Sequence, residues 1–270
     1  MYDVNYHRAS SVDDAVSKVS GSSSGSEGEA KYLAGGQTML PTMKMRLAAP
    51  SDLVDLAKVV DLSGIEVSGK RVKIGAMTTH AQVAASAELE QVCPCMAGLA
   101  SQIGDPHVRH KGTIGGSVAN YDPAADYPAA LLALDATIHT NKREVKADDF
   151  FLGLFETALE EGELITAVSY EAPDRGHYEK FRNPASRYAM AGVFVADRGG
   201  KVRVGVSGAG AEGAFRWTAA EDALASDFSP DALESLSVDA DDMLSDIHGN
   251  GAYRANLVKV MAKRAVAKAH

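Results

Sequence analysis

The sequence contains few cysteines: only Cys93 and Cys95, separated by one proline, occur in 270 residues. A disulfide requires a specific geometry between its two side chains, so we expect cysteines with one residue between them to be poor disulfide partners. A structural zinc site takes four ligands, which two cysteines do not supply. We therefore expect this chain to carry no zinc or iron–sulfur site of its own.

Long hydrophobic runs are also missing. No stretch of the sequence approaches the roughly 18 apolar residues that a membrane-spanning helix needs. The first residues, MYDVNYHRASS, lack the charged and then apolar layout of a secretory signal peptide. These two features predict a cytoplasmic chain that is not an integral membrane protein.

The sequence has no surplus of basic residues, because 27 Lys and Arg face 36 Asp and Glu and the net charge is −9. A nucleic-acid-binding protein presents a concentrated basic surface, so this charge argues against that class. No G-x-G-x-x-G motif follows the first strand, and the phosphate-binding motif G-x-x-x-x-G-K-[ST] is absent. No nucleophile–base pair is recognisable, and we expect the histidines of DPHVRH (105–110) in a solvated loop without catalytic function.

The residues that are present indicate a folded protein with a substantial core. Hydrophobic residues make up 46% of the chain and charged residues 23%, which is typical of soluble globular proteins. A length of 270 residues favours two modest domains or one large one. From about residue 175, apolar strands are followed by helices, which predicts an α+β domain with helices on one face of an antiparallel sheet. Turn-forming residues at 171–178 place the boundary there.

Two glycine segments are similar in chemistry: AGGQT at 34–38 and TIGGS at 113–117. Glycine has no Cβ and tolerates positive φ, so consecutive backbone amides can approach one anion. Each segment alone is also compatible with an ordinary tight turn. Together they could clasp a pyrophosphate from two sides, and the residues alone leave both interpretations open.

Asp126 lies just after the second glycine segment, in NYDPAADYPAAL. It precedes a helix expected to begin at Tyr127, with Pro128 near the first turn, so it is a candidate N-cap. Its carboxylate could instead accept hydrogen bonds from sugar or ribityl hydroxyls. Both roles are possible if each uses one carboxylate oxygen.

Four segments taken together resemble the medium, FAD-binding subunit of molybdenum hydroxylases, with carbon monoxide dehydrogenase-type enzymes nearest and the flavin domain of xanthine dehydrogenase more distant. They are AGGQTMLPTMKMRLA, LVDL, IGDPHVRHKGTIGGSVANYDPAADYPAALLALDA and KFRNPASRYAMAGV. The resemblance extends from about residue 3 to 265. It implies a vanillyl-alcohol-oxidase-type (PCMH-type) FAD-binding domain at 1–174, of two subdomains split near 57–62. A C-terminal domain at 175–270, with a three-stranded antiparallel sheet and helices, would follow.

The resemblance also implies which residues bind FAD. Both glycine segments would bind its pyrophosphate through backbone amides, Asp126 would hold ribityl or phosphate-side hydroxyls, and Ile103 and Tyr188 would lie near the isoalloxazine ring. Gln37 stands where covalently flavinylated relatives have His or Cys, so FAD is expected to bind non-covalently. The implied set is Tyr32, Leu33, Ala34, Gly35, Gly36, Gln37, Thr38, Met39, Ile103, Thr113, Ile114, Gly115, Gly116, Ser117, Asp126, Ile165, Lys180 and Tyr188.

The function implied by the resemblance is electron relay. A large partner subunit would oxidise the substrate at a molybdenum cofactor, and a small subunit would pass electrons through [2Fe–2S] clusters to the FAD of this chain and on to an external acceptor. A dimer of such heterotrimers, a heterohexamer, is implied, and this chain needs no catalytic residue or metal ligand. Two alternatives stay open: a stand-alone FAD-dependent oxidoreductase, and a non-enzymatic nucleotide-binding or assembly module.

Overall fold

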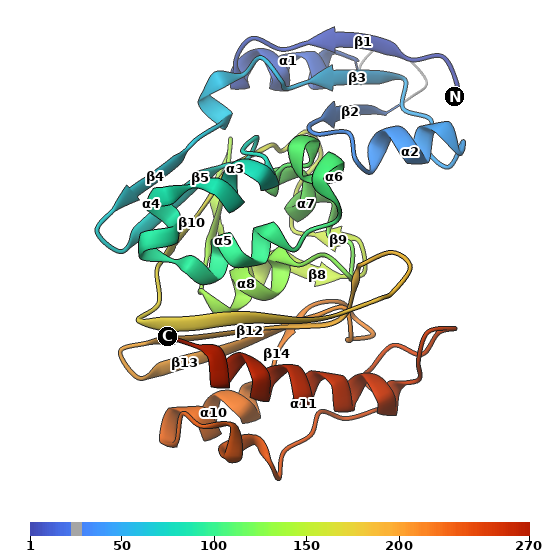
Figure 1. The fold of residues 1–270 in the computed structure, drawn as a ribbon. Helices are drawn as coiled ribbons and strands as arrows, with labels where there is room; N and C mark the ends of the chain where they lie inside the picture. The colour runs from blue at the N-terminus through green and yellow to red at the C-terminus, as the bar shows by residue number, and fades with distance from the viewer. Residues whose placement is uncertain (23–28) are drawn as a thin grey trace.

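The computed structural model describes residues 1–22 and 29–270. Figure 1 shows three parts stacked along the molecule: an N-terminal sheet, a central sheet with many short helices, and a C-terminal sheet backed by the long helix α11. Each part has its own cluster of buried apolar side chains. No helix within the described residues is both long and apolar enough to cross a membrane.

The N-terminal part is a small parallel sheet with strand order β1-β3-β2. Helix α1 packs on β2 and β3, and it begins after Ser11, whose Oγ accepts a hydrogen bond from the Asp14 amide at 3.1 Å. The bounds are β1 Asn5–Arg8, α1 Val12–Ser22, β2 Ala30–Leu33, α2 Met39–Lys44, β3 Asp52–Asp55 and the 3₁₀ helix η1 Val60–Leu62.

The central part is an antiparallel sheet with strand order β4-β5-β10-β6-β7. Strand β10 comes last in sequence but lies in the middle, where Val168 pairs with Ile74 on one side and Ile138 on the other. The strands are β4 Ile65–Ser68, β5 Arg71–Gly75, β6 Thr137–Thr140, β7 Glu144–Lys146 and β10 Ile165–Glu171, and a hairpin is formed by β8 Phe151–Gly153 and β9 Glu156–Thr157. The helices are α3 His80–Ala85, α4 Ala87–Val92, α5 Pro94–Ser101, α6 Pro106–Lys111, α7 Ile114–Asn120, α8 Tyr127–Ala133 and α9 Ala147–Phe150.

The C-terminal part is an antiparallel sheet with strand order β11-β12-β13-β14. The predicted three strands are present, and β14, only two residues long, is a fourth at the edge beside β13. So short a strand leaves no periodicity in the sequence. The elements are β11 Arg175–Arg182, β12 Ala189–Arg198, β13 Lys201–Ser207, β14 Phe215–Arg216, α10 Thr218–Ser226, the 3₁₀ helix η2 Pro230–Leu233 and α11 Gly251–Lys268.

The C-terminal sheet is covered on both faces: its own helices α10 and α11 pack on one face, as predicted, and a helix of the central part covers the other. Helix α11 packs on β11 and β12, while α8 from the central part packs on β12 and β13. The approach of α8 is close, because a Cβ built on Gly205 would lie 2.0 Å from the Ala129 carbonyl oxygen. We retain as a proposal the division into 1–174, with subdomains split near 57–62, and 175–270.

An ion pair between the exposed Arg143 and the buried Glu163 connects the β6–β7 turn to the segment before β10. The Arg143 guanidinium donates to both carboxylate oxygens of Glu163 at 3.1 Å, and the Thr140 hydroxyl and Glu160 amide also donate to this carboxylate. Burial alone would raise the pKa of Glu163, but these donors outweigh it and lower the pKa to about 2.

This pKa predicts acid sensitivity. A carboxyl with a folded-state pKa below its unfolded value stabilises the protein above the unfolded value, about 4.5, and this stabilisation disappears as the pH falls towards about 2. Since Arg143 is partly exposed, we expect Glu163→Gln to remove about 1–3 kcal/mol of the stability difference between pH 6 and pH 3. Urea unfolding of both proteins at the two pH values measures this, and an unchanged difference would contradict it.

Candidate functional site

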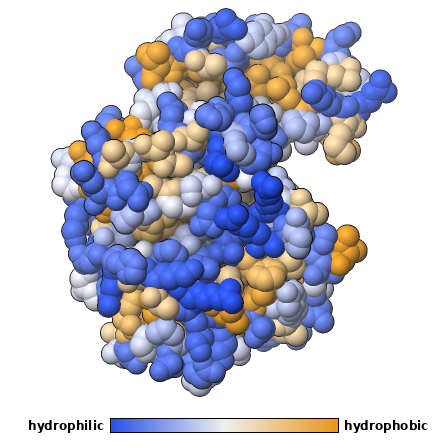
Figure 2. Space-filling view, in the orientation of Figure 1, coloured by the Kyte–Doolittle hydropathy of each residue, from blue (hydrophilic) through white to orange (hydrophobic). Residues whose placement is uncertain are grey.

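A cleft of about 1070 Å³ separates the N-terminal part from the rest of the molecule, and Figure 2 shows the surface hollowed at this level. Pockets for small ligands usually enclose roughly 300–1000 Å³, so this cleft has room for a dinucleotide-sized molecule. Both glycine segments, at 34–38 and 113–117, contribute to its wall. Segments far apart in the sequence therefore meet at this site.

The first glycine segment connects β2 to α2 and touches the end of α6. A Cβ built on Gly35 would lie 1.9 Å from the Lys111 carbonyl oxygen and 2.8 Å from Gly112 Cα. Gly36 has φ +69°, a conformation that residues with a Cβ rarely adopt. The missing side chain of Gly35 therefore lets the first glycine segment contact the chain at the end of α6. Glycine at position 36 lets the backbone turn there.

The backbone amides of this first segment are available to a ligand. Within the described residues, the amides of Gly35, Gly36, Gln37 and Thr38 donate to no protein atom. All four residues line the cleft. Consecutive amides without acceptors form a concavity of positive partial charge, which suits an anion such as a pyrophosphate. This arrangement fits the chemistry of FAD.

The second glycine segment is the first turn of helix α7 rather than a tight turn. Thr113 is its N-cap, and the Thr113 Oγ1 accepts a hydrogen bond from the Gly116 amide at 3.1 Å. Gly115 permits close packing, since a Cβ there would lie 2.5 Å from the Ala76 Cβ. Two consecutive glycines are poor helix formers, which is why the sequence did not predict this helix.

Four of the five amides of the second segment already have acceptors within the protein. Those of Ile114, Gly115 and Ser117 donate to backbone carbonyls at 2.8–3.1 Å, and that of Gly116 to Thr113. The Ser117 hydroxyl lines the cleft and makes no hydrogen bond to any described residue. The two segments therefore differ: the first presents amides to the cleft, and the second presents a hydroxyl.

Asp126 occupies the predicted N-cap position of α8, but its side chain makes no capping hydrogen bond. Its buried carboxylate instead accepts from the Tyr178 hydroxyl at 2.5 Å and from the Lys180 ammonium at 2.8 Å. Burial raises the pKa of Asp126 while the Lys180 charge opposes that shift. The aspartate thus connects α8 to β11, and it also lines the cleft.

The cleft brings together most of the residues predicted to bind FAD. Three are exceptions: Leu33 ends β2, Ile114 is fully buried in the central core, and the Lys180 side chain lies behind Asp126. The predicted residues that line it are Tyr32, Ala34, Gly35, Gly36, Gln37, Thr38, Met39, Ile103, Thr113, Gly115, Gly116, Ser117, Asp126, Ile165 and Tyr188.

Helix α6 was not predicted, because DPHVRH was expected to be a solvated loop. The Asp105 carboxylate caps it by accepting from the His107 and Val108 amides at 2.7 and 3.0 Å, and Pro106 occupies its first turn. An aspartate followed by proline is a recognised helix start, so the signal was present in the sequence. The Arg109 guanidinium donates to the Ile103 carbonyl at 2.9 Å and holds that part of the cleft wall.

His80 is a cleft residue that the sequence analysis missed. It is buried at the start of α3, where Thr79 and Gln82 form a capping box. Burial, with a smaller effect of the Arg109 charge, lowers the pKa of His80 to about 4. His80 is therefore neutral near pH 7, and its Nδ1 lies 3.3 Å from the Tyr127 hydroxyl.

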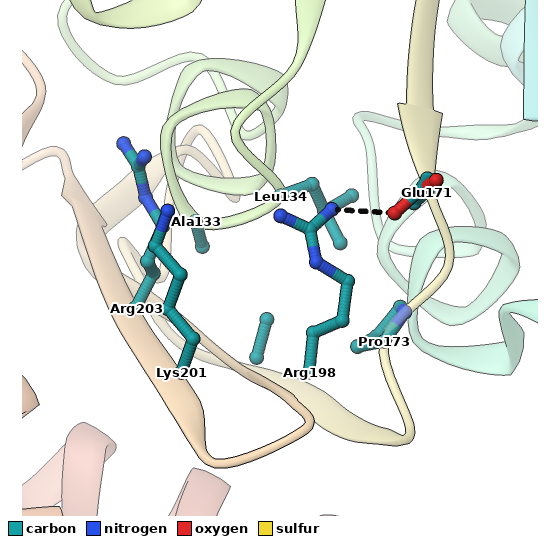
Figure 3. A pocket seen from close by; sticks show the side chains of 8 residues that line it. Ala133, Leu134, Glu171, Pro173, Arg198, Lys201 and Arg203 are labelled. Carbon is teal, nitrogen blue, oxygen red and sulfur yellow. Dashed lines mark ion pairs between the residues drawn. The ribbon is translucent and has the colours of Figure 1, made fainter. Parts of the chain in front are cut away.

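A second hollow lies beside Arg198, away from the cleft (Figure 3). The Arg198 guanidinium forms an ion pair with Glu171 at 3.4 Å along its edge. The hollow encloses about 10 Å³, which is enough for roughly one water molecule. Among the described residues, no group of three or more His, Cys, Asp or Glu side chains could hold a metal ion.

Comparison with known proteins identifies the family. Residues 2–170 match the model of the "FAD binding domain in molybdopterin dehydrogenase". The chain is 35% identical to the nicotine 6-hydroxylase medium subunit of Paenarthrobacter nicotinovorans, covering 98% of this chain and 97% of that one. It is also 35% identical to the carbon monoxide dehydrogenase medium chain of Afipia carboxidovorans, covering 98% and 96%.

Solved structures agree with these sequence matches. Reconstituted CO dehydrogenase from Oligotropha carboxidovorans aligns with a TM-score of 0.86 at 34% identity, over 99% of this chain and 97% of that chain. Quinoline 2-oxidoreductase from Pseudomonas putida 86 aligns with a TM-score of 0.84 at 27% identity, over 99% and 96%. The predicted family and α+β fold class are confirmed. The chain belongs to the family of FAD-binding domains in molybdopterin dehydrogenases.

Proposed function

We propose that this chain is the flavin subunit of a heteromeric molybdenum hydroxylase and binds FAD non-covalently in the cleft. The observation that carries the proposal is the run of amides without acceptors from Gly35 to Thr38, at the edge of a cleft of dinucleotide size. When bound, FAD supplies the capacity to exchange electrons one or two at a time, and the protein supplies binding and orientation. Gln37 offers no nucleophile for covalent attachment.

Different residues of the cleft would bind different parts of FAD, according to their chemistry. The amides of 35–38 donate to the pyrophosphate, and the Ser117 hydroxyl supports it from the opposite segment. Asp126, fixed by Lys180 and Tyr178, presents its carboxylate towards ribityl hydroxyls. The apolar side chains of Ile103 and Ile165 and the ring of Tyr188 line the part that would exclude water from the flavin.

Electron relay follows from the partners that the family comparison suggests. Relatives matched over nearly their whole length are named medium subunits or medium chains. We infer that this chain assembles in the cytoplasm with a large molybdenum-cofactor subunit and a small [2Fe–2S] subunit, as a dimer of heterotrimers. Electrons from the clusters would reach the cleft of this chain and leave to an external acceptor.

Purification from the native host under mild conditions tests this assignment. We expect the chain to co-purify with a large and a small subunit that carry molybdenum cofactor and iron–sulfur clusters. A chain that purifies alone and oxidises a substrate with its own flavin would support the stand-alone oxidoreductase instead. Tight ADP binding without flavin would support the nucleotide-binding module.

Tyr188 offers a test of how the cleft affects flavin reactivity. It follows Arg187, which has φ +64°, and its ring is 55% exposed at the wall of the cleft. Aromatic stacking contributes about 0.5–1.5 kcal/mol, so we expect Tyr188→Ala to change the rate of flavin reduction about 2- to 10-fold while FAD content stays the same. Tyr188→Phe, which keeps the ring, serves as the control. Stopped-flow absorbance measures the rate of flavin reduction. Equal rates in all three proteins would show that the Tyr188 ring does not affect flavin reactivity.

A further inference from the structure

Two buried thiols lie in contact outside the cleft, where α4 ends and α5 begins. The Sγ atoms of Cys93 and Cys95 are 3.5 Å apart, and both residues are buried in the central core. Cys93 interrupts the helices with φ −146° and ψ 66°. The break between α4 and α5 at Cys93 leaves the two thiols in contact, although their spacing had predicted poor disulfide partners.

The surroundings give the two thiols different reactivities. The hydrogen bond with Cys95 lowers the pKa of Cys93, and the same contact, together with burial, raises the pKa of Cys95. Tyr170 lies beside them, and burial together with the two sulfur atoms raises the pKa of its hydroxyl. A thiol of lowered pKa in contact with a second thiol can act as a nucleophile whose oxidised form the neighbour resolves, and because both thiols are buried the site suits only an oxidant as small as hydrogen peroxide.

We propose that Cys93 and Cys95 form a reversible two-electron redox site, which a peroxide converts into an intramolecular disulfide. The Cys93 thiolate attacks one peroxide oxygen, the O–O bond breaks, and the other oxygen leaves as water after protonation. The Cys95 sulfur then attacks the resulting sulfenic acid, the S–O bond breaks, and a second water leaves. Two thiols and one hydrogen peroxide thus give one disulfide and two waters, and the sulfurs lose the two electrons that peroxide gains.

Helix α5 connects this site to the cleft. It begins at Pro94, between the two cysteines, and ends at Ser101, two residues before the cleft residue Ile103. Disulfide formation must shorten the Sγ–Sγ distance from 3.5 Å to about 2.05 Å, and we expect this to displace the start of the helix. We expect faster FAD release after oxidation. The change in FAD release rests on the proposed function. The same holds for the source of peroxide, which would be the reaction of the reduced flavin with oxygen.

The test treats the purified full-length chain, with and without bound FAD, with hydrogen peroxide. Unreacted thiols are then alkylated in denaturant, and the intact mass is measured. We expect the loss of two hydrogen atoms and of both alkylation sites, reversed by dithiothreitol. The exposed Met45 reports in the same sample that oxidant was present. Both thiols remaining alkylatable while Met45 is oxidised would overturn the proposal.

Single variants identify the reacting sulfur. In Cys95→Ser we expect Cys93 to stop at sulfenic acid, which dimedone traps, whereas in Cys93→Ser we expect Cys95 to stay unmodified. The reverse labelling would overturn the assigned order of attack. The intact mass reports disulfide formation whether or not FAD is bound. A chain that forms no disulfide is therefore distinguishable from a chain that does not bind FAD. Unchanged FAD release from the disulfide form would overturn the coupling through α5.

Discussion

Replacing Gly35 with alanine is expected to abolish FAD retention. The new Cβ would lie 1.9 Å from the Lys111 carbonyl oxygen and 2.6 Å from its carbonyl carbon. These are backbone atoms, so the clash cannot be relieved by rotating a side chain. The first glycine segment must therefore move away from the end of α6, and its free amides move with it. We expect purified Gly35→Ala to contain less than about a tenth of the wild-type flavin, corresponding to a loss of at least about 1.4 kcal/mol in binding under limiting FAD.

The chain contains a matched control for this substitution. Gly98 lies within α5, and a Cβ built there meets no atom of residues 1–22 or 29–270 within 4 Å. Gly98→Ala should keep full flavin content and gain up to about 1 kcal/mol of stability, because alanine is the better helix former. Flavin absorbance per mole of polypeptide compares the three proteins. Wild-type flavin content in folded Gly35→Ala would show that FAD binding does not need the contact between the first glycine segment and the end of α6.

Replacing Lys180 with methionine is expected to cause the largest loss of stability. The Lys180 side chain is fully buried against Asp126, with an Nζ–Oδ1 distance of 2.8 Å. Removing one partner of a buried ion pair leaves an uncompensated charge and typically costs about 3–5 kcal/mol. The pKa of Asp126, already raised by burial, would rise further. Chemical denaturation of the protein without FAD measures the loss.

Two further variants make this prediction specific. Lys70 pairs with Asp174 in an exposed position, so Lys70→Met should change stability by less than about 1 kcal/mol. The double variant Asp126→Asn with Lys180→Met removes both charges and should recover part of the loss, since no unpaired charge remains buried. A loss below about 1 kcal/mol in Lys180→Met would mean that the pair contributes no more than a surface ion pair.

The sequence predicted those features that depend on local pattern. The apolar strands predicted after residue 175 correspond to the C-terminal sheet. Glycine pairs followed by polar residues indicated both sides of the cleft. The resemblance to a known family then connected these segments, which lie about 80 residues apart in the chain, to one ligand.

The features that the sequence did not predict depend on contacts between distant residues. Asp126 was interpreted as a cap or a ligand, but its partner Lys180 is 54 residues away. Helix α7 forms despite two glycines because Thr113 caps it and Gly115 packs on Ala76. The contact between Cys93 and Cys95 depends on the break between two helices. Neither spacing nor composition reports such contacts.

Non-covalent binding of FAD in the cleft is tested by the flavin content of the isolated chain before and after denaturation. We expect a yellow protein that contains one FAD per polypeptide and releases all of it into solution when acid or heat unfolds the chain. The stripped protein should recover its flavin spectrum when FAD is added back. A colourless protein that FAD cannot reconstitute, or flavin that stays attached to the unfolded polypeptide, would contradict non-covalent binding of FAD in this cleft.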